Sequence, residues 1–318
     1  MRHATALLLL GVPVLGLSQD PIETRNSRIE SLAFLRFEPR GDLLGNGEKR
    51  WSFGFTSAND VRLFPRGGPF TYREDYETDR VTAKYRMGMN RGEWSFEVPF
   101  EVIGGGFMDP LIQLWHEHVL GIRGDRSLLP FGQVSIDIPG QERFGSAAGI
   151  GDVSATLSRD LGGRLILSGA IKAPTGDAGR LLGSGAADAG LSLNYDWRLG
   201  RKFRVYLQAG EVYQGKPRAL RNARSYIDQE SIALTYVPTD RDSWTLQWQA
   251  EPSALVTGYS GSDGAHRMLT LGFERRLDAR HSVQAFFSED GDWANYSLPA
   301  LDNVAPDFTF GLRFVIKG

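Results

Sequence analysis

Cysteine is absent from the 318-residue chain, which excludes disulfide bonds and thiolate metal sites. The charges nearly balance, with a formal net charge of −2, so no basic surface for nucleic acid is expected. Long apolar runs are also lacking. The longest, residues 4–17, falls short of the roughly 20 residues that a membrane-spanning helix needs. Composition therefore disfavours both a nucleic-acid-binding protein and a helical membrane protein.

The N-terminus has the pattern of a secretory signal peptide. The basic pair Arg2-His3 precedes the apolar run, and Gly16-Leu17-Ser18 supplies the small residues of a cleavage site. We therefore expect residues 1–18 to be removed on export. Because no cysteine stands at the cleavage site, a lipoprotein anchor is not expected.

After the signal, apolar and polar residues alternate with the period of a β-strand. In the segment from Trp94 to Val102, for example, large apolar residues alternate with Ser95, Glu97 and Glu101. A soluble β-sandwich would bury the apolar face between two sheets. A transmembrane barrel would turn the apolar face to lipid and the polar face to its lumen. Alternation alone is compatible with both.

Strand lengths and connections favour the barrel. The predicted strands run about 9 to 14 residues, close to the roughly 9 to 11 that cross a bilayer at a tilt. Every second connection is a short turn, such as Asn90-Arg91-Gly92, and most of the others are longer. Outer-membrane barrels have this asymmetry, with short periplasmic turns and long extracellular loops. We therefore predict an all-β, antiparallel transmembrane barrel of about 12 strands at 47–318, in the bacterial outer membrane. The strands are expected at 49–58, 75–89, 93–103, 150–160, 164–173, 186–198, 202–214, 225–237, 242–255, 264–276, 281–290 and 306–317.

Two further features indicate an outer-membrane barrel. Large aromatic residues gather near the short-turn end on the outward register, as in the girdle at a membrane interface. They are Trp51, Trp94, Trp197, Phe203, Tyr236, Trp244 and Phe273. The last strand, from Thr309 to Ile316, resembles the C-terminal insertion signal of such barrels. The expected partners are therefore outer-membrane lipid and the barrel insertion machinery.

Short motifs in a set order resemble a domain-of-unknown-function family of bacterial outer-membrane β-barrel proteins. They are Thr24-Arg25-Asn26 with Phe34-Leu35-Arg36-Phe37, Gly104-Gly105-Gly106-Phe107-Met108-Asp109-Pro110 with His116, Gly149-Ile150-Gly151-Asp152, Pro174-Thr175-Gly176-Asp177 and Gly183-Ser184-Gly185. The resemblance covers most of the mature chain and implies a barrel, but it implies no reaction. The Gly-x-Gly-Asp and Pro-Thr-Gly elements also resemble barrels proposed to carry small organic compounds across the outer membrane.

Residues 104–121 interrupt the strand pattern and predict one short helix in a long extracellular loop. Asp109 can cap the helix, Pro110 suits its first position and Gly121 suits its exit. The loop, 104–149, is the longest connection. Twelve tilted strands leave a bore of roughly 15 Å, and a helix is about 10 to 12 Å across. We expect the helix to fold inward and constrict the pore, and a lid on the surface is the alternative.

The candidate pore-lining residues come from this loop and from inward-facing strand positions. They are Asp109, Trp115, His116 and Glu117 in the loop, and Lys84, Arg86, Glu97, Glu101, Glu251 and Arg313 in the strands. Charges of both signs either line a path for polar solutes, with little ion selectivity, or pair with one another and rigidify a narrow barrel. Residues 19–46 are expected to form an N-terminal periplasmic segment. Within it, 24–37 could plug the periplasmic mouth, lie along the wall or fold only with a partner.

These observations favour a narrow channel or uptake pore for small solutes, constricted by the 104–149 connection. No catalytic, metal or cofactor site is expected. His116 and His118, two residues apart on a helix, point in different directions and cannot bind one ion, and the sequence holds no H-E-x-x-H motif. An outer-membrane enzyme acting on lipid or lipopolysaccharide and a purely structural barrel are the alternatives.

Overall fold

The computed structural model describes residues 20–64, 72–121, 125–138, 140–258, 260–289 and 306–318. The signal peptide expected at 1–18 lies outside these residues. Within the described residues, no helix combines the length and the apolar character needed to cross a membrane.

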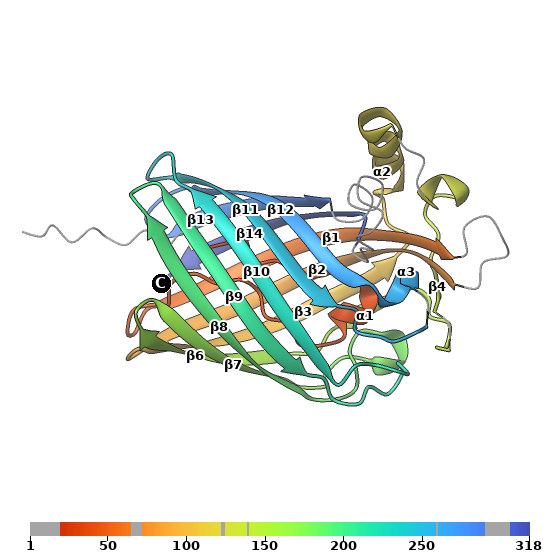
Figure 1. Cartoon of the computed structure of the whole chain (residues 1–318), viewed down its shortest axis with the longest axis horizontal. Coiled ribbons are helices and arrows are strands. Elements are labelled where there is room, and N and C mark those ends of the chain that lie inside the picture. The colour runs from red at the N-terminus through yellow and green to blue at the C-terminus, as the bar shows by residue number, and fades with distance from the viewer. Residues whose placement is uncertain (1–19, 65–71, 122–124, 139, 259, 290–305) are drawn as a thin grey trace, which may run out of the picture.

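The chain forms a closed antiparallel β-barrel (Figure 1). Consecutive strands pair from β6 to β14, β14 pairs with β1, and the pairings β1–β2, β2–β3 and β3–β6 complete the ring. The sheet has 14 strands, and setting aside the short β4 and β5 leaves the 12 long strands that the sequence predicted. The long strands are β1 (Lys49–Phe64), β2 (Tyr72–Met89), β3 (Gly92–Gly104), β6 (Ser154–Gly162), β7 (Leu165–Lys172), β8 (Asp188–Leu199), β9 (Phe203–Tyr213), β10 (Tyr226–Tyr236), β11 (Asp242–Pro252), β12 (Ala265–Arg276), β13 (His281–Glu289) and β14 (Phe308–Lys317).

The two ends of the barrel differ, and we call them the short-turn end and the long-loop end. Short turns, such as the one between β2 and β3, lie at the end where the C-terminus is found (Figure 1). The short elements gather mainly at the opposite end. They are α2 (Asp109–Trp115) with its π-helical continuation η1 (His116–Leu120), η2 (Asp125–Leu128), β4 (Ser135–Asp137), β5 (Ala147–Ile150), η3 (Ala178–Arg180) and α3 (Ser260–Asp263). In outer-membrane barrels the short turns face the periplasm.

The long strands turn apolar side chains outward and polar side chains inward. On β8, for example, Leu193 is 44% exposed, whereas its neighbours Ser192 and Asn194 are buried. An apolar outer surface of this extent is expected only where lipid covers it. Near the short-turn end, aromatic rings such as those of Trp244 and Phe273, 4.7 Å apart, form part of the predicted girdle.

The strand expected at 150–160 is interrupted at 151–153, between β5 and β6, which both pair with β3. The break turns Asp152 toward the lumen. Its carboxylate accepts hydrogen bonds from Lys172 Nζ at 2.5 Å and from the backbone N–H of Gly176 at 2.8 Å. The Gly-x-Gly-Asp and Pro-Thr-Gly motifs thus meet at one buried carboxylate and hold this part of the wall together.

A charge on the lipid-facing surface tests the assignment of the two faces. Leu246 is 50% exposed on β11, and an arginine facing lipid near the bilayer midplane costs about 2 to 4 kcal/mol. We expect Leu246→Arg to lower the free energy of unfolding from lipid vesicles by this amount, measured by guanidinium titration. Leu246→Met keeps an apolar side chain of similar volume and should have little effect. Equal losses in the two variants would contradict the assignment.

Candidate functional site

Residues 20–46 lie inside the barrel, and we call them the luminal segment. They enter at the short-turn end, where Asp20 pairs with Arg50 at the start of β1. The chain runs to α1 (Ile29–Leu32), near the long-loop end, and then returns to β1 (Figure 1). The segment therefore has both of its ends at the same mouth. The sequence analysis expected residues 19–46 in the periplasm. The described residues of that range, 20–46, lie in the lumen instead.

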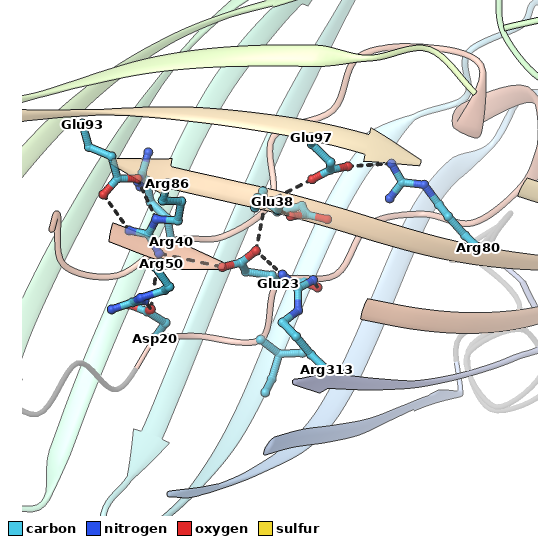
Figure 2. Close-up of polar contacts among 12 residues, drawn as sticks. Asp20, Glu23, Glu38, Arg40, Arg50, Arg80, Arg86, Glu93, Glu97 and Arg313 are labelled. Carbon is cyan, nitrogen blue, oxygen red and sulfur yellow. Dashed lines mark hydrogen bonds and ion pairs between the residues drawn. The ribbon is translucent and has the colours of Figure 1, made fainter. Parts of the chain in front are cut away.

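Ion pairs bind the outgoing limb of the luminal segment, residues 20–28, to the barrel wall. Glu23 contacts Lys84 Nζ of β2 at 2.8 Å and also pairs with Arg313 of β14 (Figure 2). The Lys84 ammonium contacts Glu38 of the returning limb at 2.5 Å and Glu97 of β3 at 3.2 Å. One cation thus joins both limbs of the segment to the barrel wall.

The returning limb, residues 33–46, carries arginines that pair with carboxylates of the wall. Arg36 Nε lies 2.6 Å from Glu251 of β11. Arg40 pairs with Glu93 of β3, which also accepts a hydrogen bond from Arg86 of β2 at 2.6 Å (Figure 2). Buried charges are stable only when they are paired and hydrogen-bonded. The segment and the wall therefore neutralise each other on several sides of the lumen.

Backbone groups of the luminal segment also find partners on the wall. The Leu35 N–H donates to Asp188 of β8 at 2.8 Å, and the Phe37 N–H donates to Gln229 of β10 at 2.9 Å. An irregular chain inside a barrel needs such partners, because a buried backbone group without a hydrogen bond is costly. These strands lie far from β2 in the ring, so the segment is held from opposite sides.

A buried arginine fixes the turn at α1. Arg28 is 0% exposed and its Nε lies 2.7 Å from Glu30 and 3.1 Å from Asp60, while its Nη2 pairs with Glu74. Asp60 and Glu74 belong to β1 and β2. Three carboxylates around one guanidinium compensate its burial and anchor the turn to these two strands.

Loops close the long-loop end over α1 by apolar packing. Ile29, Ala33 and Phe34 of the luminal segment belong to one buried cluster with residues of the wall and the loops. The other members are Tyr72, Tyr76, Ile103, Ile136, Ile138, Ala147, Leu181, Leu182, Leu220, Ala254 and Leu255. Apolar side chains thus close the long-loop mouth, whereas ion pairs fill the lumen toward the short-turn end.

Little free volume is left beside the luminal segment. A cavity between both limbs and strands β2, β3 and β6 to β9 has a volume of about 70 Å³. A water molecule takes about 30 Å³ of liquid, so this cavity holds only a few waters. The described residues therefore leave no room for a solute beside the segment.

The six predicted strand residues line the filled lumen and take part in ion pairs. They are Lys84, Arg86, Glu97, Glu101, Glu251 and Arg313. Four of them, Lys84, Arg86, Glu251 and Arg313, pair with the luminal segment. Glu97 and Glu101 pair with Arg80 of the wall. Of the two possibilities left open by the sequence, the charges pair rather than line an open path.

The helix that was expected to constrict the pore lies on the outer side of the barrel. The ring of Trp115 packs against Phe287 at 6.1 Å, and that of Phe107 packs against Phe310 at 6.4 Å. Phe287 and Phe310 occupy outward registers of β13 and β14. The expectation of an inward helix is therefore wrong. The luminal segment already fills the bore and leaves no space for a helix.

The other three loop candidates also lie outside the lumen. Asp109 Oδ1 accepts hydrogen bonds from Asn59 Nδ2 and Arg126 Nη1, each at 3.0 Å. His116 is 3% exposed, and Glu117 is bonded within its own helix. Within the described ranges, no group of three or more histidine or acidic side chains is placed to hold a metal ion. These residues stabilise the loop rather than line a pore.

The sequence analysis missed the luminal partners of the wall, which are Asp20, Glu23, Arg28, Arg36, Glu38 and Arg40. A signal for them was present. Residues 20–42 carry five acidic and four basic residues in a stretch that does not alternate with the strand period. The inward registers of the strands carry charges of both signs, with which such a segment can pair.

Electrostatics keep the luminal segment ionised. Burial alone would raise the pKa of Glu23, but Arg313 and Lys84 outweigh it and hold the pKa well below its ordinary value. Asp20 behaves in the same way. Burial opposes its ionisation, and Arg50 and Arg86 lower its pKa. The segment is therefore docked through charged carboxylates at neutral pH.

Comparison with known proteins agrees with this architecture. The model of a family described as of unknown function, DUF3187, matches residues 40–294. The chain belongs to this family. No match was found among curated proteins.

Solved outer-membrane proteins resemble this DUF3187 chain in fold. The COG4313 outer-membrane channel of Pseudomonas putida is 16% identical and has a TM-score of 0.53, over 86% of this chain and 97% of that chain. The toluene transporter TbuX of Ralstonia pickettii is 10% identical with a TM-score of 0.41, over 86% of this chain and 89% of that chain. The first likeness shows an outer-membrane barrel fold, as the family resemblance predicted.

Acid should release the luminal segment of this DUF3187 protein only at low pH. Because the folded pKa of Glu23 is lowered, its contribution to docking is complete above the ordinary value of 4.5 and is lost as the pH falls below it. We expect a cysteine introduced at Ser27 to stay protected from pH 8 to 5 and to become reactive only as the pH falls well below 4.5. The reagent is 4,4′-dithiodipyridine, which reacts with thiols in acid.

A matched variant separates this effect from general unfolding. Glu23→Gln in the same Ser27→Cys background should increase the reaction at neutral pH, because Arg313 loses its carboxylate partner and Lys84 loses one of three. The barrel should remain folded, as judged by its mobility on unheated gels. Exposure of Ser27→Cys between pH 7 and 6, before Glu23 can be protonated, would argue against this account.

Proposed function

We propose that the protein is an outer-membrane channel or uptake pore for small solutes, closed by the luminal segment. The observation that carries this proposal is that a separate stretch of chain, the luminal segment, occupies the bore. A twelve-strand barrel without it has a bore of roughly 15 Å, which is wide enough for small molecules. The channel character of the COG4313 protein, which shares the fold, supports the same function.

The path of the luminal segment suits a plug that can leave. Both of its ends lie at the short-turn mouth, where Asp20 pairs with Arg50 and where the Leu44 N–H donates to Glu93 at 3.0 Å. The two limbs can therefore withdraw together as one loop without threading through the barrel. Many of their contacts are hydrogen bonds and ion pairs, which water entering the lumen can replace.

The lumen points to polar solutes. Its wall presents Lys84, Arg86 and Arg313 beside Glu97 and Glu251, and hydroxyl and amide groups occupy many of the remaining inward registers. Charges of both signs give little preference for cations or anions. The 104–149 connection contributes to closure at the long-loop mouth through its buried apolar residues, and its helix has no part in the constriction.

Removal of the luminal segment tests the function directly. Deleting residues 21–44 should raise the single-channel conductance in planar bilayers several-fold, because the bore is then open. Deleting residues 110–120 of the outer helix is the matched control and should leave the conductance unchanged. Liposome swelling with sugars of increasing size would give the solute limit. A 21–44 deletion that inserts as a folded barrel but does not conduct would refute the proposal.

An exchange of charges tests whether ion pairs hold the plug. Arg36→Glu places a carboxylate against Glu251 and should raise the open probability strongly, since an unpaired buried charge costs about 3 to 5 kcal/mol. Adding Glu251→Arg restores an opposite pair and should return the open probability most of the way to the original value. If the double variant stays as open as the single one, the pair does not hold the plug.

A further inference from the structure

Three polar groups on the outer face of the barrel are buried rather than exposed. Asn59 of β1 and Asp75 and Glu77 of β2 share the outward register with the lipid-facing Trp51 and Val81, and yet each of the three is 1% exposed. Charged groups on the lipid face of a barrel are destabilising. Some other part of the protein must therefore cover this patch.

The patch lies within the height of the apolar band of a membrane. Antiparallel strands rise about 3.4 Å per residue and tilt by about 40°, so each residue gains about 2.6 Å along the membrane normal. Tyr85 pairs with Trp51 of the aromatic girdle, and Glu77 lies eight residues beyond Tyr85. Glu77 therefore stands about 21 Å above the girdle, inside a band about 25 Å tall.

The segment before the outer helix is anchored on Glu77. The Glu77 carboxylate accepts the backbone N–H groups of Phe107 at 3.2 Å and Met108 at 3.0 Å. Gly106 has a φ of +65°, and a Cβ there would lie 2.0 Å from the Glu77 carboxyl carbon. The left-handed backbone and this close approach explain the glycine at position 106.

The start of the helix covers the other two polar groups. Asp75 Oδ1 accepts a hydrogen bond from Arg126 Nη1 at 2.5 Å. The same guanidinium donates to Asp109, the first residue of α2, and Asp109 in turn accepts from Asn59. Asp109 and Arg126 thus cover Asn59 and Asp75 from outside through hydrogen bonds.

The helix that rests on this network has three different flanks. Ile112 and His116 form the buried flank and are 0% and 3% exposed. Leu111 and Leu114, which lie about 60° apart around the helix axis, are 52% and 55% exposed. Glu117 lies on the third flank, away from Leu111, and is bonded within the helix. An apolar flank beside a polar flank is typical of a helix at a membrane interface.

The apolar flank is continuous with the lipid-facing surface of the barrel. Trp115 packs on Phe287, and Phe107, itself 63% exposed, packs on Phe310. Phe310 lies six residues from Ile316, which pairs with Trp51 of the girdle, so it stands about 16 Å above the girdle. The helix therefore starts within the outer half of the apolar band.

We propose that residues 107–120 form a lipid-binding element that lies against the barrel in the outer leaflet. Phe107, Leu111 and Leu114 contact the acyl chains, and the flank of Glu117 faces the headgroups. The element covers the polar patch of the barrel and presents an apolar surface to the lipid at the same height. This inference is independent of the channel function.

The absence of cysteine from the chain allows a direct test. Single cysteines at Leu114 and Glu117 are labelled with a small environment-sensitive fluorophore, and the full-length protein is inserted into phospholipid vesicles with nitroxide groups on the acyl chains. The label at Leu114 should be quenched at least twofold more than the label at Glu117. Ile171→Cys, on the lipid face and 63% exposed, is the positive control, and Arg143→Cys, in an exposed loop, is the negative control.

Aqueous iodide provides the second measurement and should reverse the order, quenching the Glu117 label more than the Leu114 label. The proposal is overturned if the label at Leu114 responds to nitroxide lipid no more than the label at Arg143, or if iodide quenches it fully. Either result would place the apolar flank in water or against another protein. If Leu114→Cys does not fold, Leu111→Cys on the same flank serves instead.

Discussion

Pairing of charge inside a narrow barrel is the constraint on which the rest of the structure depends. The strands project cations and carboxylates into a lumen where an unpaired charge is costly. Lys84 shows how the constraint is met, because its ammonium contacts Glu97 of the wall and also Glu23 and Glu38 of the luminal segment. The segment is therefore the interior of this fold, in the sense in which a hydrophobic core is the interior of a soluble domain.

An ionic interior behaves differently from an apolar one when water enters. Replacing a buried ion pair by well-packed apolar residues is often neutral or stabilising, so the pairs add little net stability, although removing one partner is destabilising. Water that reaches the lumen solvates both partners at once and weakens their hold. Water cannot compensate in this way for the loss of the apolar packing of Ile29 and Phe34 at the long-loop mouth, because exposing apolar side chains to water costs free energy. Under the proposed channel function, withdrawal of the luminal segment therefore depends on that seal as well as on the ion pairs.

The sequence predicted the wall of the barrel well and its filling poorly, for a physical reason. Alternation reports which face of a strand meets lipid, and the 12 long strands follow from it. It does not report what lies inside. The helix that begins at Asp109 was predicted correctly, but its N-cap is Met108 rather than Asp109, and the side of the wall on which it lies was predicted wrongly. The bore could accept a helix by size, and the competing occupant, residues 20–46, has no periodic pattern by which to recognise it.

One stretch of sequence does hold the information that alternation lacks. From Tyr72 to Arg80, β2 is polar or aromatic on both registers, so neither face of this stretch can be left against lipid or empty space. Each face must therefore be covered by another part of the chain. Inside, Glu74 receives Arg28 of the luminal segment, and outside, Glu77 receives the backbone before the outer helix. A barrel strand that is polar on both faces thus predicts two covering segments, one on each side of the wall. The two non-strand stretches of this chain that lie on opposite sides of β2 are those segments.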